Sequence, residues 1–579
     1  MKSTLKLSAY DIINGLSFEP LEYVNDISAI FKNPLKKKFF SLDPETRPYL
    51  KPVKYNNKRY IHIEDEDYLA DIIGVELLKT GEWSYGVIPN KDRNKITQAV
   101  VGLLYNLLQK EIAQFSSENL IEMIYHDLEE TLYNLLLAER RYASELACYP
   151  EKEKEFLHDY NELNRTSLAL KFMLEYVAAQ PPKGLKFMGI GEYEYILAIC
   201  SLIIEWAYKG DLFNYNIFNT KVEILPSNRV GMEQNSFINM YQYGMKFRRE
   251  KLCYNLPQNY KEENSIRQED YANDLNAAFF SEFGYIFDDF IRVIYIMIIY
   301  TSNKDEDVFI ENKNSFISSL AKFDPTLSVD LIYRVIDDIT IKAREDFLIP
   351  PNGYTKLDIY PWRFNRKYSF IRKPVVLRND DLIWGNRQLY HMVEYVTHLI
   401  FEGQFPANSK EMKSLLGIIS HDRGNKFNKF VVELLEDMHV FGVKPNVKKI
   451  NKKNISDENG NTLGDIDILI IDEERKKIYA TEVKDFNFSR NPYEIQMEYE
   501  KLFVDSPKKK SYVTKHQRRV EWLKLHMEDV ITYYGLSYAK WEIIGIFIVS
   551  EPLISKDIYG KEIEIISVNE LNVERLRKI

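Results

Sequence analysis

The chain has 579 residues, of which 45% are hydrophobic and 28% are charged, and its formal net charge is −9. That length exceeds what one hydrophobic core organises, so roughly two to four domains are expected. The composition is that of a folded chain and not of a disordered one. The negative net charge excludes binding of nucleic acid through the global field of the molecule, so any such contact has to come from local basic patches.

The cysteines and the apolar runs indicate a cytoplasmic protein. Cys148, Cys200 and Cys253 lie far apart and form no CxxC pair, which argues against a disulfide scaffold and against a structural zinc site. The first residues, MKSTLKLSAYDIINGL, lack the apolar core of a signal peptide. The longest apolar runs, YILAICSLII and VIYIMIIY, are too short to cross a bilayer, so we expect buried helices and no membrane contact.

Residues 1–345 are predicted to form a mainly α-helical N-terminal region. From about residue 95 onward, apolar residues recur at spacings of three and four, which is typical of amphipathic helices. The region contains no Walker A motif, no GxGxxG and no zinc-ligand spacing, so ATP hydrolysis is not expected. Three roles stay open for it: sensing, gating of a substrate, and association with a second copy or a partner protein.

Residues 346–420 are predicted to be a linker module. The double proline and the Asn-Gly of FLIPPNGYTKLDIYPWRFNRKYSF (347–370) end the helical pattern, and SFIRKPVVLRNDDLIWGN then predicts a β-hairpin that turns at Asn379-Asp380. Residues 386–416 return to a helical pattern. The basic and aromatic residues of 360–373 suit phosphate contact with base stacking and suit an interface between domains equally well.

Residues 421–579 are predicted to be a separate domain with the element order α-β-β-β-α-β. Its elements are a helix (423–439), strands (441–449, 465–472, 476–484), helices (491–503, 515–534) and strands (541–550, 564–568). The whole chain is therefore expected to be an α+β multidomain protein, helical at its N-terminal side.

Four charged residues stand on two of these strands, where burial of bare charge is costly. Asp465 and Asp467 share one face of the first strand, and Glu482 and Lys484 share one face of the next. The short turn DEERK (472–476) joins the strands into a hairpin, so the charges can meet on one sheet face. Such a group predicts a hard divalent cation, because Mg²⁺ prefers oxygen ligands and needs only one or two carboxylates. The alternative is a solvated hairpin face, since ExK triplets also occur by chance.

An acidic residue on one strand followed by an acidic-x-Lys triplet on the next resembles the PD-(D/E)xK nuclease superfamily, which has the restriction-endonuclease-like fold. The resemblance covers about residues 422–550, under a third of the chain. Asp467, in GDID, matches the first acid better than Asp465 does, Glu482 matches the second, and Lys484 matches the lysine. The resemblance implies that Asp467, Glu482 and the Val483 carbonyl hold Mg²⁺ or Mn²⁺, and that Lys484 orients or helps deprotonate the attacking water.

The sequence departs from this family pattern at two positions. Many relatives carry a glutamate on the first helix in a GxxFE setting, whereas this chain has GNKFN, with Asn428 in that place. Asn428 offers a carbonyl oxygen but no carboxylate, which puts a second metal in doubt. Some relatives also have a QxxxY helix after the lysine, and here Gln496 and Tyr499 are one residue closer together.

Basic segments surround the predicted site and suggest contacts with a phosphate backbone. They are VKKINKK (447–453), SPKKKSYVTKHQRR (506–519) and Arg490. The helix that starts near Lys515 presents cationic and polar side chains within about one turn, and such clusters are how proteins meet phosphates. These side chains are Lys515, Gln517, Arg518 and Arg519. The alternative is an ordinary charged, solvated helix face.

Together these observations predict a metal-dependent endonuclease that hydrolyses phosphodiester bonds, with DNA favoured over RNA as the substrate. A role in restriction or in defence against invading DNA follows only from the resemblance, because many relatives serve it. Two other hypotheses stay open. The first is a catalytically inactive nuclease-fold protein that binds nucleic acid, and the second is a structural or signalling protein that acts through its helical region.

Overall fold

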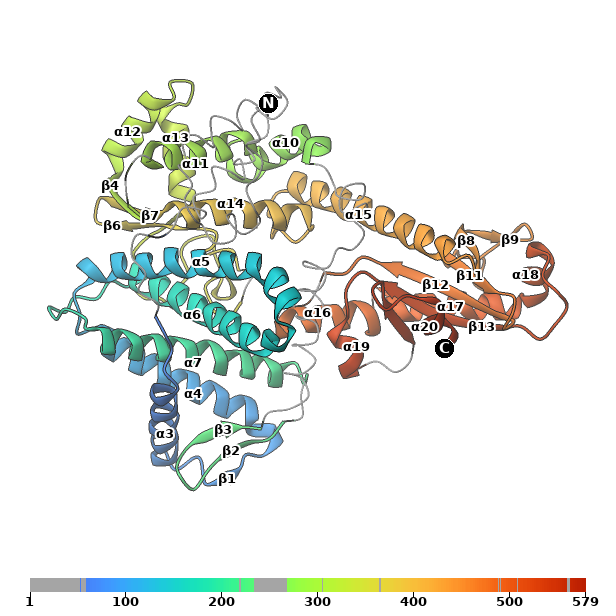
Figure 1. Ribbon diagram of the computed structural model, residues 1–579, viewed down its shortest axis with the longest axis horizontal. Helices are drawn as coiled ribbons and strands as arrows, with labels where there is room; N and C mark the ends of the chain where they lie inside the picture. Colours follow the sequence, from blue (N-terminus) through green and yellow to red (C-terminus); the bar gives the residue numbers. More distant parts are fainter. Residues whose placement is uncertain are drawn as a thin grey trace. The chain divides into compact units, whose positions relative to one another are not determined.

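The computed structural model describes most of the chain. The described residues are 53, 59–217, 220–233, 268–302, 304, 306–363, 366–487, 489, 491–507, 509–559 and 563–579. The chain divides into two compact units, which we call the helical unit (1–210, 221–232 and 267–416) and the sheet unit (211–220, 233–266 and 417–579). The predicted α+β class, with helices dominating the N-terminal half, is confirmed (Figure 1). No helix within the described ranges has both the length and the apolarity that a membrane span requires.

The helical unit contains long helices and two small sheets. Its main helices are α3 (Ile63–Lys79), α4 (Arg93–Ile112), α5 (Ser117–Cys148), α6 (Glu153–Ala179), α7 (Ile190–Asn214, which crosses the unit boundary), α10 (Ala272–Phe283), α11 (Phe287–Ser302), α12 (Lys313–Phe323), α13 (Val329–Asp338) and α14 (Asn386–Phe401). Helix α5 packs against α6 and α14, and α3 packs against α4. The apolar runs of α7 and α11 are largely buried, as the sequence predicts for helices of a protein core.

The two small sheets come from segments that are far apart in sequence. The first has the order β1-β2-β3, and the second has the order β4-β7-β6-β5. The strands are β1 (Gly86–Val87), β2 (Val222–Ile224), β3 (Val230–Met232), β4 (Val308–Asn312), β5 (Thr340–Ile341), β6 (Val375–Arg378) and β7 (Asp381–Gly385). The predicted hairpin is confirmed, because β6 and β7 are antiparallel and Arg378 pairs with Asp381 across the turn. Asn379 has a φ of 55°, which two-residue hairpin turns require and Asn tolerates.

Two basic residues of the segment 360–373 are buried inside the helical unit. The Arg366 side chain is buried and donates to the Glu175 carboxylate on α6, which also accepts a hydrogen bond from the Phe370 amide at 2.6 Å. The Lys373 ammonium is buried and donates to the Asp338 carbonyl. These cations therefore join the linker module to elements of the predicted N-terminal region, and they are not presented to solvent.

The sheet unit has the predicted element order, with some additions. Its elements are α15 (Lys410–Asp437, shared with the helical unit), β8 (Gly442–Val447), β9 (Lys449–Ile450), β10 (Lys453–Asn454), β11 (Ile466–Asp472), β12 (Lys477–Lys484), α16 (Pro492–Phe503), α17 (Tyr512–Leu525), α18 (Met527–Tyr534), β13 (Glu542–Val549), α19 (Ile554–Tyr559), β14 (Glu564–Ser567) and α20 (Val573–Arg577). The predicted boundary at residue 421 lies inside α15, which contains no proline to stop it. The helix predicted over 515–534 is two helices, α17 and α18, which meet at His526.

The strands form one mixed sheet with the order β14-β13-β12-β11-β8. Strands β8, β11 and β12 are antiparallel neighbours, while β12, β13 and β14 are parallel. The edge strand β8 has Pro445 opposite Ile468 and Lys444 opposite Leu469. The long crossover from β12 to β13 contains α16, α17 and α18, as a parallel connection needs.

The two faces of this sheet are covered by different helices. Ile468 and Ile470 of β11 pack with Phe427 and other residues of α15, whereas Leu469 and Ile471 pack with residues of α17 and α18. Ile466 stands two residues before Ile468, but it packs with the α17 group at the end of the strand. Even-numbered residues of β12, such as Ile478 and Ala480, face α17, so Glu482 and Lys484 at its end do the same.

Candidate functional site

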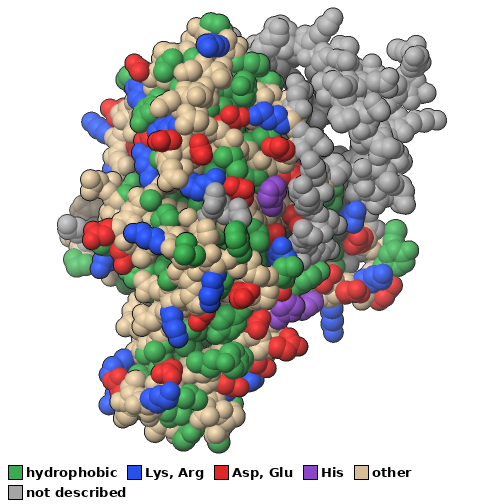
Figure 2. Space-filling model, turned by 90° about the vertical axis from the view of Figure 1, so that its left-hand side faces the viewer, with side chains coloured by type: hydrophobic (Ala, Val, Ile, Leu, Met, Phe, Trp, Pro, Cys, Tyr) green, Lys and Arg blue, Asp and Glu red, His purple; other side chains and the backbone are tan. Residues whose placement is uncertain are grey.

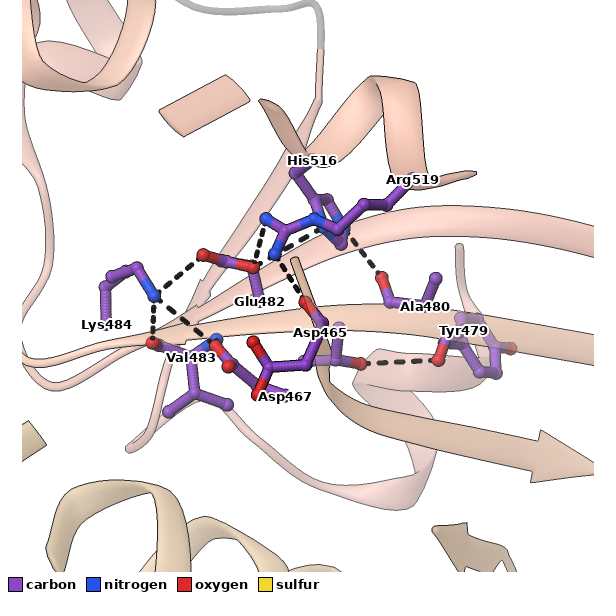
Figure 3. Close-up of polar contacts among 10 residues, drawn as sticks. Asp465, Asp467, Tyr479, Ala480, Glu482, Val483, Lys484, His516 and Arg519 are labelled. Atoms are coloured by element: carbon purple, nitrogen blue, oxygen red, sulfur yellow. Dashed lines mark hydrogen bonds and ion pairs between the residues drawn. The ribbon is translucent and has the colours of Figure 1, made fainter. Parts of the chain in front are cut away.

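Asp467 and Glu482 are brought together by the register of β11 and β12. Ile468 pairs with Thr481, so the next residue pair along the ladder is Asp467 with Glu482. Residues directly opposite each other share a face, and here that face is the one covered by α17. The amide of Val483 donates to Asp467 Oδ2 at 2.7 Å, which fixes the aspartate side chain against the neighbouring strand (Figure 3).

The Lys484 ammonium lies where three oxygen atoms converge. Its Nζ is 2.7 Å from Glu482 Oε1, 3.0 Å from the Val483 carbonyl oxygen and 3.4 Å from Asp467 Oδ2 (Figure 3). Burial raises the pKa of Asp467, and the repulsion of Glu482 raises it further. Burial alone would lower the pKa of Lys484, but attraction by Glu482 and Asp467 outweighs it and the pKa is raised. Lys484 is therefore charged at neutral pH.

Arg519 of α17 holds the other oxygen of Glu482. Its Nη2 donates to Glu482 Oε2 at 2.6 Å, and its Nη1 donates to the backbone carbonyl of Asp465. Both side chains are nearly inaccessible, with Glu482 4% and Arg519 6% exposed. Arg519 was predicted to contact nucleic acid, whereas in this structure its side chain turns inward and pairs with the buried carboxylate.

His516, one turn before Arg519, also packs against the site. Its Nε2 lies 2.9 Å from the Ala480 carbonyl oxygen, and its Nδ1 lies 3.7 Å from Glu482 Oε2. Burial, and then the charge of Arg519, lower the pKa of His516 to about 3, so the ring is neutral. From the sequence, Arg519 was predicted to contact nucleic acid, and His516 was not predicted to belong to the site. The spacing of three between them on one helix face was the signal that could have joined them to the site.

Among the residues that the structure describes, Asp465, Asn428 and Gln496 are not joined to this cluster by side-chain hydrogen bonds. Asp465 takes part through its backbone carbonyl. Asn428 stands on α15, which covers the other face of the sheet, and in the described part of the chain no hydrogen bond links it to Asp467, Glu482 or Lys484. The amide nitrogen of Gln496 donates to Glu500 Oε1 at 2.9 Å on α16, so it contacts a helix neighbour instead.

The other side chains of α17 that were predicted to contact nucleic acid differ in their exposure. Arg518 is exposed, and its Nη2 lies 3.3 Å from Asp457 Oδ2. Lys515 and Gln517 are partly exposed on the same helix. Arg490 lies outside the described residues. Lys515, Gln517 and Arg518 therefore lie on the solvent side of α17, while His516 and Arg519 face the sheet.

The donor set fits a magnesium-type ion. Two carboxylates and one carbonyl converge on a positive group, and Mg²⁺ typically takes one or two carboxylates and completes its shell with water. No cluster of three or more His, Cys, Asp or Glu side chains with metal-binding geometry occurs among the residues that the structure describes. Because the three candidate donors are all oxygen atoms, a softer metal that prefers nitrogen or sulfur ligands fits this site poorly.

The fold and the site define a two-unit α+β protein with a largely buried Asp-Glu-Lys-Arg cluster at the end of two neighbouring strands. Residues 183–569, about two thirds of the chain, match the model of the Upx-like family, described as anti-phage proteins. The chain therefore belongs to the Upx-like family of anti-phage proteins, and the expected role in defence against phage is confirmed. No curated protein and no solved structure shows a significant match to the chain.

Proposed function

We propose that this anti-phage protein is a metal-dependent endonuclease that hydrolyses phosphodiester bonds, in DNA in preference to RNA. The observation on which the proposal rests is the convergence of Asp467, Glu482 and the Val483 carbonyl on the Lys484 ammonium. This group of residues is the one that the resemblance to PD-(D/E)xK nucleases requires at one point of two adjacent strands.

In this proposal each residue has a distinct task. Asp467, Glu482 and the Val483 carbonyl would hold Mg²⁺ or Mn²⁺, and a bound ion of this kind lowers the pKa of water and stabilises charge on a phosphoryl group. Lys484 orients the attacking water and donates to a phosphoryl oxygen. Its raised pKa supports the role of a fixed positive donor over that of a general base. The nucleophile then attacks phosphorus in line with the leaving oxygen.

Arg519 is a positioning residue in this mechanism. It occupies Glu482 Oε2, so the remaining oxygen, Oε1, points towards Lys484 and Asp467. A guanidinium forms two directed bonds at once, here to Glu482 and to the Asp465 carbonyl, and it thereby ties the carboxylate to the start of β11. The carboxylate is thus fixed before any ligand binds.

One observation favours the alternative of a nucleic-acid-binding protein without catalysis. Two carboxylates, Asp467 and Glu482, face two cations, Lys484 and Arg519, so the four charges balance as they would in a structural ion-pair network. Asn428 in place of an acid points the same way. This alternative predicts that DNA binds with the usual salt dependence while no strand is cut.

The test is cleavage of supercoiled plasmid DNA in the presence of Mg²⁺ or Mn²⁺. We expect Glu482→Gln to abolish nicking, because the variant loses a charged ligand. The matched control is Glu498→Gln, which changes another buried glutamate of the sheet unit, one bonded to Ser489 and Ser555. The proposal is contradicted if both variants cut the plasmid, and also if neither the variants nor the wild type cut it. Circular dichroism spectra show whether each variant is folded.

A further inference from the structure

A short basic ribbon lies next to the edge strand of the sheet unit. Strands β9 and β10 are antiparallel, with Ile450 opposite Lys453, and the turn residues Asn451 and Lys452 have φ values of 47° and 67°. Positive φ at both positions is typical of the tight hairpin turn that gives a well-defined ribbon. Residues 438–456 contain five lysines and no acidic residue, in a chain whose net charge is −9. The ribbon is therefore a positively charged region on a molecule whose net charge is negative.

The ribbon is fixed to the body of the sheet unit. Ile450 and Ile455 are buried among residues of α17 and α18. The side chain of Asn451 donates to Asp529 Oδ1 at 2.9 Å, and Lys453 Nζ donates to Asp529 Oδ2 at 2.6 Å. Because Asp529 belongs to α18, this helix and the ribbon lie side by side, as Figure 1 also shows. Because the ribbon is already held in place, binding of a partner here costs little backbone entropy of the ribbon.

Three lysines of the ribbon remain available for an anion. Lys448, Lys449 and Lys452 are exposed, and none of them forms an ion pair with an acid in the described ranges. On the face of the molecule drawn in Figure 2, by contrast, basic and acidic side chains are interspersed over the coloured surface. Several ammonium groups without acidic partners, held on a fixed backbone, can contact the phosphates of a nucleic acid and displace the counterions bound to them.

The ribbon begins close to the candidate site and on the same face of the sheet. Val447, just before Lys448, pairs with Ile466, which directly precedes Asp467. Neighbouring strands are about 4.8 Å apart, so Lys448 starts on the order of 10 Å from the carboxylates. Val447 and Ile450 pack in the cluster that includes α17, which also covers the site. Duplex DNA has one charge per about 1.7 Å of its axis, so a duplex bound at the site would present several phosphates within that distance.

We infer that the β9–β10 ribbon is a sequence-independent phosphate clamp for duplex DNA. Lys448, Lys449 and Lys452 contact backbone phosphates a few nucleotides away from the phosphodiester at Asp467 and Glu482. The inference rests on the proposed function for the choice of DNA, and it adds the place where the substrate is gripped. Duplex DNA fits because its major groove is wide enough to admit a two-stranded ribbon, whereas that of duplex RNA is deep and narrow.

The test compares two double variants of the full chain. Lys449→Gln with Lys452→Gln changes the ribbon, and Lys477→Gln with Lys540→Gln removes the same charge at the other end of β12 and before β13. Binding of a mixed-sequence DNA duplex is followed by fluorescence anisotropy across salt concentrations, in EDTA so that no strand is cut. We expect the ribbon variant to bind about tenfold more weakly than the wild type. Its slope of log K against log salt should be smaller by about 0.9 per lysine removed. The control variant should keep the wild-type slope.

Three outcomes would overturn the clamp. The first is an unchanged slope in the ribbon variant, and the second is an equal loss of DNA affinity in both variants. The third is a duplex RNA of the same sequence that binds the wild type as tightly as the DNA does and is weakened as much by the ribbon substitutions. Cleavage is a separate readout. Wild-type protein that binds duplex DNA through the ribbon but never nicks plasmid would disprove the proposed nuclease and leave the clamp standing.

Discussion

Each unit of the molecule contains a buried network of opposite charges, and the two networks differ in access to solvent. In the helical unit, Glu129 of α5 accepts hydrogen bonds from the Arg387 and Gln388 amides at 3.2 and 3.1 Å and from Arg387 Nη1 at 3.1 Å. Its side chain is 0% exposed. In the sheet unit, the side chains of Asp467 and Lys484 are 16% and 27% exposed.

Under the proposed function, this difference separates a structural network from a reactive one. Glu129 satisfies the N-terminal amides of α14, and Arg387 also pairs with Asp307, so these groups join three distant segments of the helical unit. Asp467, Glu482 and Lys484 instead come from two adjacent strands, and the side chains of Asp467 and Lys484 are partly exposed to solvent. The same residue types therefore support opposite expectations for substitution.

The largest effect is expected from Lys484→Ala. The variant loses the positive group beside the proposed attack position, so cleavage of plasmid DNA should fall by about a thousandfold or more. Binding of duplex DNA in EDTA should change little, because the ribbon lysines are intact. Wild-type cleavage rates in this variant would place the Asp467–Glu482 cluster in the same structural class as Glu129.

Arg387→Met should act on stability and not on chemistry. The change leaves Glu129 and Asp307 buried without their shared cation, and breaking such a network costs about 3–5 kcal/mol. Urea unfolding measures the loss. The matched control is Arg518→Met, an exposed arginine with one acidic partner, for which a change below about 1 kcal/mol is expected. Equal losses in the two variants would remove the contrast between buried and exposed pairs.

The pH dependence of stability should show a contribution from Glu129. Burial raises the pKa of this carboxyl from 4.5 to about 7, so between these values the folded chain holds a proton that the unfolded chain releases. Stability from this group therefore decreases as pH rises from about 4.5 to about 7, by roughly 3 kcal/mol, and is constant above that. Thermal unfolding of wild type and Glu129→Gln across this range tests it, since the variant should lack that decrease.

The smallest effect is expected from Arg519→Lys. A lysine keeps the charge beside Glu482 but cannot bond to Glu482 and the Asp465 carbonyl in the same geometry, so cleavage should fall by about tenfold. Arg519→Met should lose more. The concentration of Mg²⁺ needed for half-maximal cleavage should also rise in both variants, a change that loss of folding alone would not produce. An unchanged Mg²⁺ requirement in Arg519→Met would contradict the positioning role.

Much of the sheet unit could be predicted from its sequence, because its elements are local and strongly patterned. The alternation of β11 and the short turn before β12 predict the register that places Asp467 opposite Glu482. The hairpin of β6 and β7 follows in the same way from Asn379 at its turn. The continuation of α15 through residue 421 did not follow, because nothing at the expected boundary marks a helix end.

The contacts of α17 and of the helical unit could not be predicted in this way. Arg519 reaches Glu482 across 37 positions of the chain, and Glu129 reaches Arg387 across 258 positions. Periodicity indicates which side of a helix is polar, but it does not show which distant carboxylate an arginine meets. The sequence therefore predicted the strands of the site and their acids, and it missed the helix residues that hold them.

The proline and lysine of the edge strand β8 have a consequence for how the molecule associates. A strand from a second copy that approached this edge would find no amide proton at Pro445, and it would meet the charge of Lys444. The five-stranded sheet is thus protected on that side from growing by strand addition. Copies that accumulate in an infected cell would have to associate, if at all, through a different surface.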